Sequence, residues 1–272
     1  MKNYWQKIQL TTALGIALLS NMAYSPPLQA KPVSTSLTSI RFTPPPPPPD
    51  RGAVGNRGGA ASRGCNSEQT VTALVPIYEQ TVNKTKQEAV TIGKVWGLTD
   101  TEHPSLLFFV PYKTSSIANI EFVLQKQVNN KSQTIYRTAL TPAVSPGIIS
   151  VSLPETIPPL EAETMYRWFL KVKVTCNPQQ PSQLDYVEGW IQRINKNPAL
   201  TELLKQAQPQ QKVKIYAEKG IWYDAIATLV QLRLANPNDR NLLADWTSFL
   251  NSVGLESLAN QPLTNCCKAN NK

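Results

Sequence analysis

Short apolar runs recur through the middle of the chain and are separated by clusters of proline, glycine and asparagine. Several runs alternate apolar and polar residues with a period of two, which is typical of strands with one buried face. In the clearest run, 166–176, apolar residues from Tyr166 to Val174 fall on one side and basic residues such as Lys171 on the other. Phe169 is the exception, since it lies on the polar side. The runs of this kind are 71–76, 89–98, 106–112, 120–125, 134–140, 148–154, 166–176 and 186–194.

Seven or eight such strands, with turn signals between them, predict an antiparallel β-sandwich domain over about residues 65–195. One detail refines this prediction. Tyr166 opens a strand six residues after Leu160, which resembles the tyrosine corner of immunoglobulin-like and fibronectin type III domains. The alternative, an ordinary core tyrosine, stays open.

The pattern changes to a helical period after residue 196, so the chain as a whole is predicted to be α+β, with a helical module over 196–263. Asn197 and Pro198 form a helix-start signature. The offsets of one tetratricopeptide repeat are matched by Tyr216, Gly220, Trp222, Ala225, Leu229 and Pro237. Because a single repeat cannot bury its own faces, we expect these helices to pack together and against the sheet. A partner-binding surface is the alternative.

The two ends of the chain differ from this folded part. Residues 1–30 combine a basic start, about twelve apolar residues and a small residue at Ala30, as in a cleaved secretory signal peptide. Residues 31–64 hold a run of six prolines followed by glycines, which predicts a disordered spacer. Residues 264–272 form a polar tail. No segment is apolar enough over about 20 residues to predict a transmembrane span.

The basic charge is concentrated in the predicted spacer. The formal net charge of the whole chain is +9. Residues 31–64 carry +4 of it, from Lys31, Arg41, Arg51, Arg57 and Arg63 against Asp50. A nucleic-acid-binding domain would concentrate its charge on a fold, so we expect no nucleic-acid partner. The oligomeric state is not predicted.

Export changes the interpretation of the four cysteines. In an oxidising compartment, disulfides are the expected state. We predict a Cys65–Cys176 bond because each residue lies at an edge of the same predicted domain. Cys266 and Cys267 are adjacent, and a vicinal bond, a bond between chains and no bond all stay open. The spacing of the cysteines does not fit a structural zinc site.

The chain offers little catalytic chemistry. It holds one histidine, His103, in a loop before proline, and no recognisable nucleophile, metalloprotease or dinucleotide motif. Carboxylate pairs for glycoside hydrolysis come together only in space, and the nearest pairs in the sequence are Glu161 with Glu163 and Asp185 with Glu188. We therefore predict no catalytic residue, no metal ligand and no cofactor.

Aromatic residues provide the candidate binding positions. Trp190, Trp222 and Tyr223 would bind a partner, such as an envelope protein or a glycan, if they are exposed. The other interpretation places them at an interface between the sheet and the helices.

Many motifs occur together in an order that resembles a family. They include "GLTDTEHPSLLFFVPY", "PGIISVSLP", "PLEAETMYRWFLKV", "VEGWIQRI" and "GIWYDAIATLVQLR". The chain is similar, over about residues 51–263, to the cyanobacterial family called domain of unknown function 928. The resemblance implies an exported protein of a photosynthetic bacterium and assigns no activity.

These observations lead to two functional hypotheses. The first is an exported, non-enzymatic cell-envelope or secreted protein that binds another macromolecule. The second is a carbohydrate-binding or carbohydrate-acting envelope protein that uses a carboxylate pair in a cleft between sheet and helices.

Overall fold

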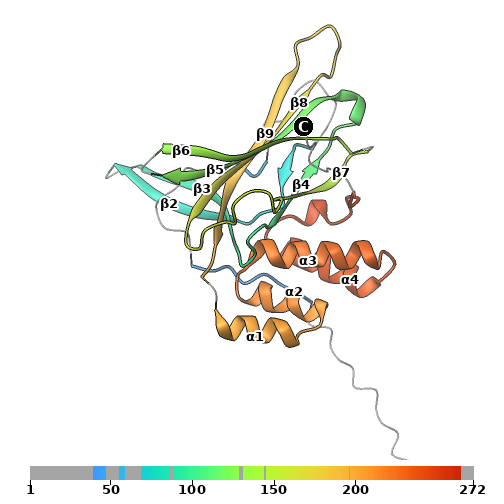
Figure 1. Ribbon diagram of the computed structural model, residues 1–272. Helices are drawn as coiled ribbons and strands as arrows, with labels where there is room; N and C mark the ends of the chain where they lie inside the picture. The colour runs from blue at the N-terminus through green and yellow to red at the C-terminus, as the bar shows by residue number, and fades with distance from the viewer. Residues whose placement is uncertain are drawn as a thin grey trace, which may run out of the picture. The chain divides into compact units, whose positions relative to one another are not determined.

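The strands of the described part of the chain form two sheets, and helices follow them (Figure 1). The computed structural model describes residues 39–46, 55–58, 69–85, 88–128, 131–143, 145–195 and 197–264. All of these lie in the unit Thr38–Lys272. The predicted signal peptide, Cys65, Cys266 and Cys267 lie outside the described residues.

The larger sheet has six strands in the order β2-β3-β9-β8-β5-β6. Its pairs are antiparallel, except that β3 runs parallel to β9, with Trp96 opposite Trp190. The smaller sheet has the order β1-β4-β7 and is antiparallel. The strands are β1 (Thr72–Ala73), β2 (Ile77–Thr85), β3 (Glu88–Thr99), β4 (Ser105–Val110), β5 (Ile117–Val128), β6 (Lys131–Leu140), β7 (Gly147–Ser152), β8 (Met165–Val174) and β9 (Gln183–Arg193).

The two sheets pack against each other through large apolar side chains. The ring of Phe108 on β4 lies 5.4 Å from that of Trp168 on β8 and 6.2 Å from that of Phe122 on β5, centroid to centroid. All three side chains are fully buried. The period-two pattern of β8 is confirmed, because its apolar side, from Tyr166 to Val174, is buried in this core.

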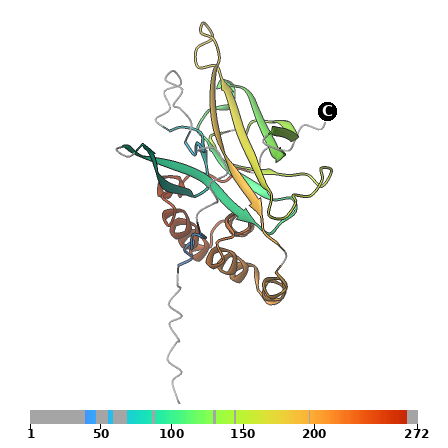
Figure 2. The same cartoon turned by 90° about the vertical axis from the view of Figure 1, so that its left-hand side faces the viewer.

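Within the described residues, four helices follow the sheets, and in both views they lie together on one side of the strands (Figure 2). They are α1 (Pro198–Gln206), α2 (Pro209–Glu218), α3 (Trp222–Ala235) and α4 (Arg240–Asn251), and a short 3₁₀ turn (Glu256–Leu258) follows them. The start of α1 is as predicted, since the Asn197 side chain accepts hydrogen bonds from the backbone N–H groups of Ala199 and Leu200. The mixed α+β class is therefore confirmed.

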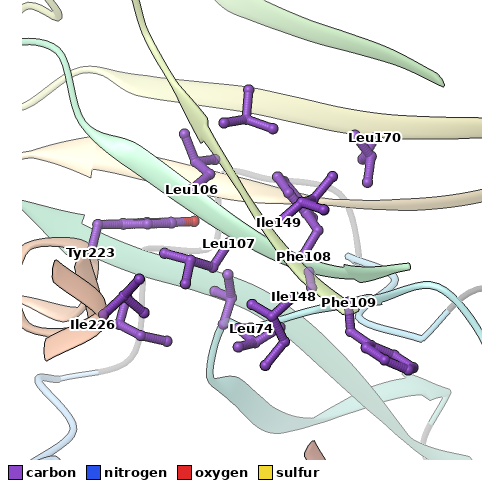
Figure 3. Close-up of a cluster of buried hydrophobic side chains, with 14 of the residues drawn as sticks. Leu74, Leu106, Leu107, Phe108, Phe109, Ile148, Ile149, Leu170, Tyr223 and Ile226 are labelled. Carbon is purple, nitrogen blue, oxygen red and sulfur yellow. The ribbon is translucent and has the colours of Figure 1, made fainter. Parts of the chain in front are cut away.

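Helices α2, α3 and α4 share the core of the sheets. Figure 3 shows Tyr223 and Ile226 of α3 beside Leu106 and Leu107 of β4. The approach of α3 to the sheet also requires a glycine, because a Cβ atom on Gly97 would lie 2.9 Å from the Tyr223 ring. Sheet and helices therefore depend on each other for their burial.

Part of the predicted spacer is folded onto this body. We call residues 39–46 the strap. Phe42 is buried, and its ring lies 5.0 Å from that of Trp222 and 6.3 Å from that of Phe249. The backbone N–H of Thr43 donates to the carbonyl of Ala217 at 3.0 Å. For these residues the spacer prediction is wrong, because Ile40 and Phe42 are buried in the core that the sheets and helices share. The proline run from Pro47 onward lies outside the described residues.

Residues 55–58 lie along the edge of β9. The backbone of Asn56 forms an antiparallel bridge with Glu188, and Arg57 donates its side-chain hydrogen bonds to the carbonyls of Val253 and Gly254. This segment, which the sequence pattern also places in the spacer, therefore connects the larger sheet with the end of the helical region.

Candidate functional site

The aromatic residues singled out in the sequence are buried. Trp222 and Tyr223 are fully buried, and Trp190 is 4% exposed. The Trp222 indole N–H donates to the carbonyl of Leu74 at 2.8 Å. Tyr223 Oη accepts from the indole N–H of Trp168 at 2.9 Å and donates to the carbonyl of Trp190 at 3.0 Å. The partner-binding interpretation of these residues is wrong, because α3 uses Trp222 and Tyr223 to pack on the sheets.

The two carboxylate pairs do not form a catalytic arrangement. Glu161 is exposed and forms an ion pair with Lys126 at 2.6 Å, while Glu163 accepts a hydrogen bond from the backbone N–H of Asn195. Asp185 and Glu188 lie on opposite faces of β9, since they are three residues apart on a strand. Asp185 is buried in the core, and Glu188 faces the other side.

The side of the larger sheet that faces away from the smaller one carries an unusual combination of rings and charges. We call it the outer face. Cross-strand register places Arg167 opposite Trp190, Phe169 opposite Glu188 and Lys171 opposite Tyr186. Its side chains include Glu121 and Val123 of β5, Arg137 of β6, Arg167, Phe169, Lys171 and Lys173 of β8, and Leu184, Tyr186, Glu188 and Trp190 of β9.

Arg167 lies at the centre of this face. Its guanidinium carbon lies 4.8 Å from the ring centroid of Phe169 and 5.7 Å from that of Trp190. The guanidinium also contacts the Glu188 carboxylate at 2.7 Å. Contacts of this kind hold a planar cation flat against aromatic rings. They fix the side chains on both strands, so the centre of the face is pre-organised.

The outer face carries a small excess of positive charge. On β5, β6, β8 and β9 the cations of this face are Arg137, Arg167, Lys171 and Lys173 and the anions are Glu121 and Glu188, which gives 4 − 2 = +2. Glu121 contacts Arg137 at 2.9 Å and Lys171 at 3.9 Å. The Lys171 ammonium also lies 5.7 Å from the Phe169 centroid. Beyond these contacts, the exposed Lys173 adds a cation at the end of the face.

Solvent reaches the apolar side chains at this same end. Leu184 is 58% exposed and Tyr186 is 40% exposed, and they are neighbours on one side of β9. In register they lie opposite Lys173 and Lys171. An exposed ring and an exposed aliphatic group thus lie beside two lysines on a pair of neighbouring strands.

Cys176 follows β8 near this end of the sheet. It is half-buried, and it is not a free thiol. The other cysteines lie outside the described residues, so the Cys65–Cys176 pairing stays a prediction.

Sequence reasoning missed Leu184, Tyr186 and the role of Phe169. One signal was present, because Phe169 interrupts the polar side of the β8 pattern. An aromatic residue on the solvent side of a half-buried strand predicts an aromatic ring at the protein surface. Its neighbours on β9 could not be placed beside it without the register of the two strands.

The fold defines a mixed α+β protein in which two facing sheets and a group of helices share one core. None of the helices in the described ranges has the length and hydropathy needed to cross a membrane. The chain belongs to the family described as Domain of Unknown Function (DUF928), which it matches over residues 56–263. The comparison with curated proteins found no match.

Proposed function

We propose that this is an exported, non-enzymatic protein of the cell envelope or the surrounding medium that binds an acidic polysaccharide through the outer face. The observation that carries the proposal is the juxtaposition of Tyr186 and Leu184, both exposed, with Lys171 and Lys173 on the neighbouring strand. Aromatic faces cover the apolar C–H surface of a sugar ring. Lysine and arginine bind carboxylate groups, which such polymers carry along their length.

Export rests on the pattern of the first thirty residues. A basic start, an apolar run too short to span a membrane and a small residue at Ala30 support cleavage and release. The predicted Cys65–Cys176 disulfide belongs to the same proposal, because disulfides persist in oxidising compartments.

A finer description of the fold accompanies this proposal. We propose an immunoglobulin-like sandwich, supported by the backbone N–H of Glu161, which donates to Tyr166 Oη at 2.9 Å from five residues upstream. A tetratricopeptide-like hairpin of α2 and α3 is supported by the tight turn at Gly220, whose φ of 71° favours glycine. The proposed cyanobacterial origin rests on the resemblance of the sequence alone.

The binding proposal is tested by titrating the purified chain with polygalacturonate, an acidic polymer, and with dextran, a neutral one. We expect binding to polygalacturonate that weakens with added salt, because surface charges are screened within about 10 Å at 0.1 M salt. Dextran should bind more weakly. Tyr186→Ala and Lys173→Ala should each weaken polygalacturonate binding by about 5–10-fold, which corresponds to roughly 1 kcal/mol.

A matched control separates the outer face from general surface hydrophobicity. Leu184→Ala should weaken binding, whereas Leu203→Ala, the same substitution at a 52% exposed position on α1, should not. Equal binding by these two variants, or equal binding of both polymers by the wild type, would contradict the proposal.

A further inference from the structure

A polar cavity lies away from the outer face, between α2, α3 and the connection from β3 to β4. Its volume is about 240 Å³. Its polar lining includes Thr101, His103, Ser105, Tyr216, Asp224 and Thr228. None of the described residues that line it is a lysine or an arginine. A single water molecule needs only about 10–15 Å³ of such volume, so the cavity has room for a small organic ligand.

Asp224 provides the acidic side chain in the wall of this cavity. Its carboxylate accepts hydrogen bonds from Thr99 Oγ1 at 2.8 Å, from the backbone N–H of Asp100 at 3.0 Å and from Thr101 Oγ1. All three donors are neutral. Burial raises the pKa of the Asp224 carboxyl, and its hydrogen bonds only partly oppose this effect. A buried carboxylate that lacks a cation is stabilised by a positive group brought next to it.

The other residues that line the cavity also favour a cationic ligand. Burial, and the neighbouring carboxylates of Asp224 and Asp100, raise the pKa of Tyr216, so its phenol keeps its proton. His103 Nε2 lies 3.0 Å from the carbonyl of Ile157 and must donate to it, because a carbonyl oxygen only accepts. When the ring carries a single proton, Nδ1 is therefore an acceptor. Tyrosine rings and acceptor atoms together favour a cation over an anion.

We propose that this cavity binds a small organic cation whose protonated primary amine contacts the Asp224 carboxylate, with Tyr216 and His103 in the surrounding wall. Two sources share this chemistry, an amino sugar and an aliphatic amine. The inference is independent of the polysaccharide proposal, because the cavity and the outer face share no residue.

The test is calorimetric titration of the purified full chain with glucosamine and with 1,4-diaminobutane. The neutral counterparts are glucose and 1,4-butanediol. We expect at least one amine to bind saturably and about 10-fold or more tighter than its neutral counterpart. The amine that binds identifies the source. If each amine binds no tighter than its neutral counterpart, or if neither amine binds saturably up to about 10 mM, the inference is overturned.

Two variants locate the site. Asp224→Asn should lower amine affinity by about 10-fold or more. Because this change removes a buried carboxylate with three donors and can impair folding, a second variant decides the matter. Ala227→Phe fills the cavity and leaves the donors to Asp224 in place, so it should abolish amine binding. The measurement is made on variant protein whose circular dichroism spectrum matches that of the wild type. Ala235→Phe, the same substitution at the exposed end of α3, should bind like the wild type. Wild-type affinity in Ala227→Phe would overturn the inference.

Discussion

In the described structure, the buried carboxyl groups of Asp185 and Asp224 accept hydrogen bonds from neutral donors. Asp185 accepts from the phenol of Tyr112 at 2.7 Å and from the backbone N–H of Val71 at 3.3 Å. Its other oxygen, Oδ1, has no hydrogen-bond partner among the described residues. Burial raises the pKa of Asp185, and these hydrogen bonds oppose the effect only in part. Ionising Asp185 therefore costs free energy in the folded state.

This raised pKa makes stability depend on pH. The folded state holds the Asp185 proton more tightly than the unfolded state does, so its contribution to stability is largest below the ordinary carboxyl pKa of about 4 and is lost as the pH rises through the raised pKa. Asp185→Asn should flatten this part of the dependence. Urea unfolding between pH 4 and pH 7 measures the change in unfolding free energy with pH. The pKa of Asp224 is also raised, so Asp224 contributes a pH dependence of the same sign, and this contribution remains in the variant. An unchanged difference in unfolding free energy between the two pH values would show that Asp185 does not titrate in this way.

At the scale of elements, local signals in the sequence were reliable. All eight predicted apolar runs overlap strands, and α3 ends at Ala235, directly before Asn236 and Pro237. Proline stops a helix and constrains the residue before it, so this boundary follows from covalent geometry. Strand β2 was missed because its sequence, IYEQTVNKT, is largely polar, and it pairs only at the edge of the sheet.

Helix α1 has a side-chain cap at its start and is packed outside the main core. Its buried residues Leu200 and Leu204 pack in a small cluster with Ile221, separate from the main core. Asn197→Ala removes the side chain that caps the first turn, which costs about 1 kcal/mol. We expect faster amide hydrogen exchange in residues 200–206 and little change in the sheets. Asn260→Ala, at an exposed asparagine outside the helices, is the control, and equal exchange in both variants would argue against the cap.

At the scale of the whole molecule, the arrangement of distant segments could not be predicted from the sequence. The outer face needs the register of β8 on β9, and the strap needs the position of α3 and α4. Two apolar residues, Ile40 and Phe42, next to a proline run are too few for a periodic signal. The coarse class was predictable because alternation and helical spacing are local, whereas burial of Trp222 and Tyr223 depends on the complete core.

The strap is expected to contribute substantially to stability. Phe42→Ala should lower the unfolding free energy by about 3 kcal/mol, because a buried aromatic side chain is lost and a cavity is left. A chain shortened to the family match, 56–263, lacks the strap and should lose at least as much while exposing Trp222 and Phe249. Urea unfolding measures both. Arg41→Ala, at the exposed neighbouring position, is the control, and wild-type stability of the shortened chain would show that the strap is dispensable.

The backbone N–H of Phe42 donates to Ser252 Oγ across 210 positions of the sequence. The strap is synthesised before the sheets and helices, but it can dock fully only after α4 has been synthesised. Closing so long a loop is entropically unfavourable and tends to slow folding. If the chain crosses a translocation channel with its amino end first, the strap stays undocked until α4 has emerged. The contacts of Phe42 with Trp222 and Phe249 would then form only after nearly the whole chain is available.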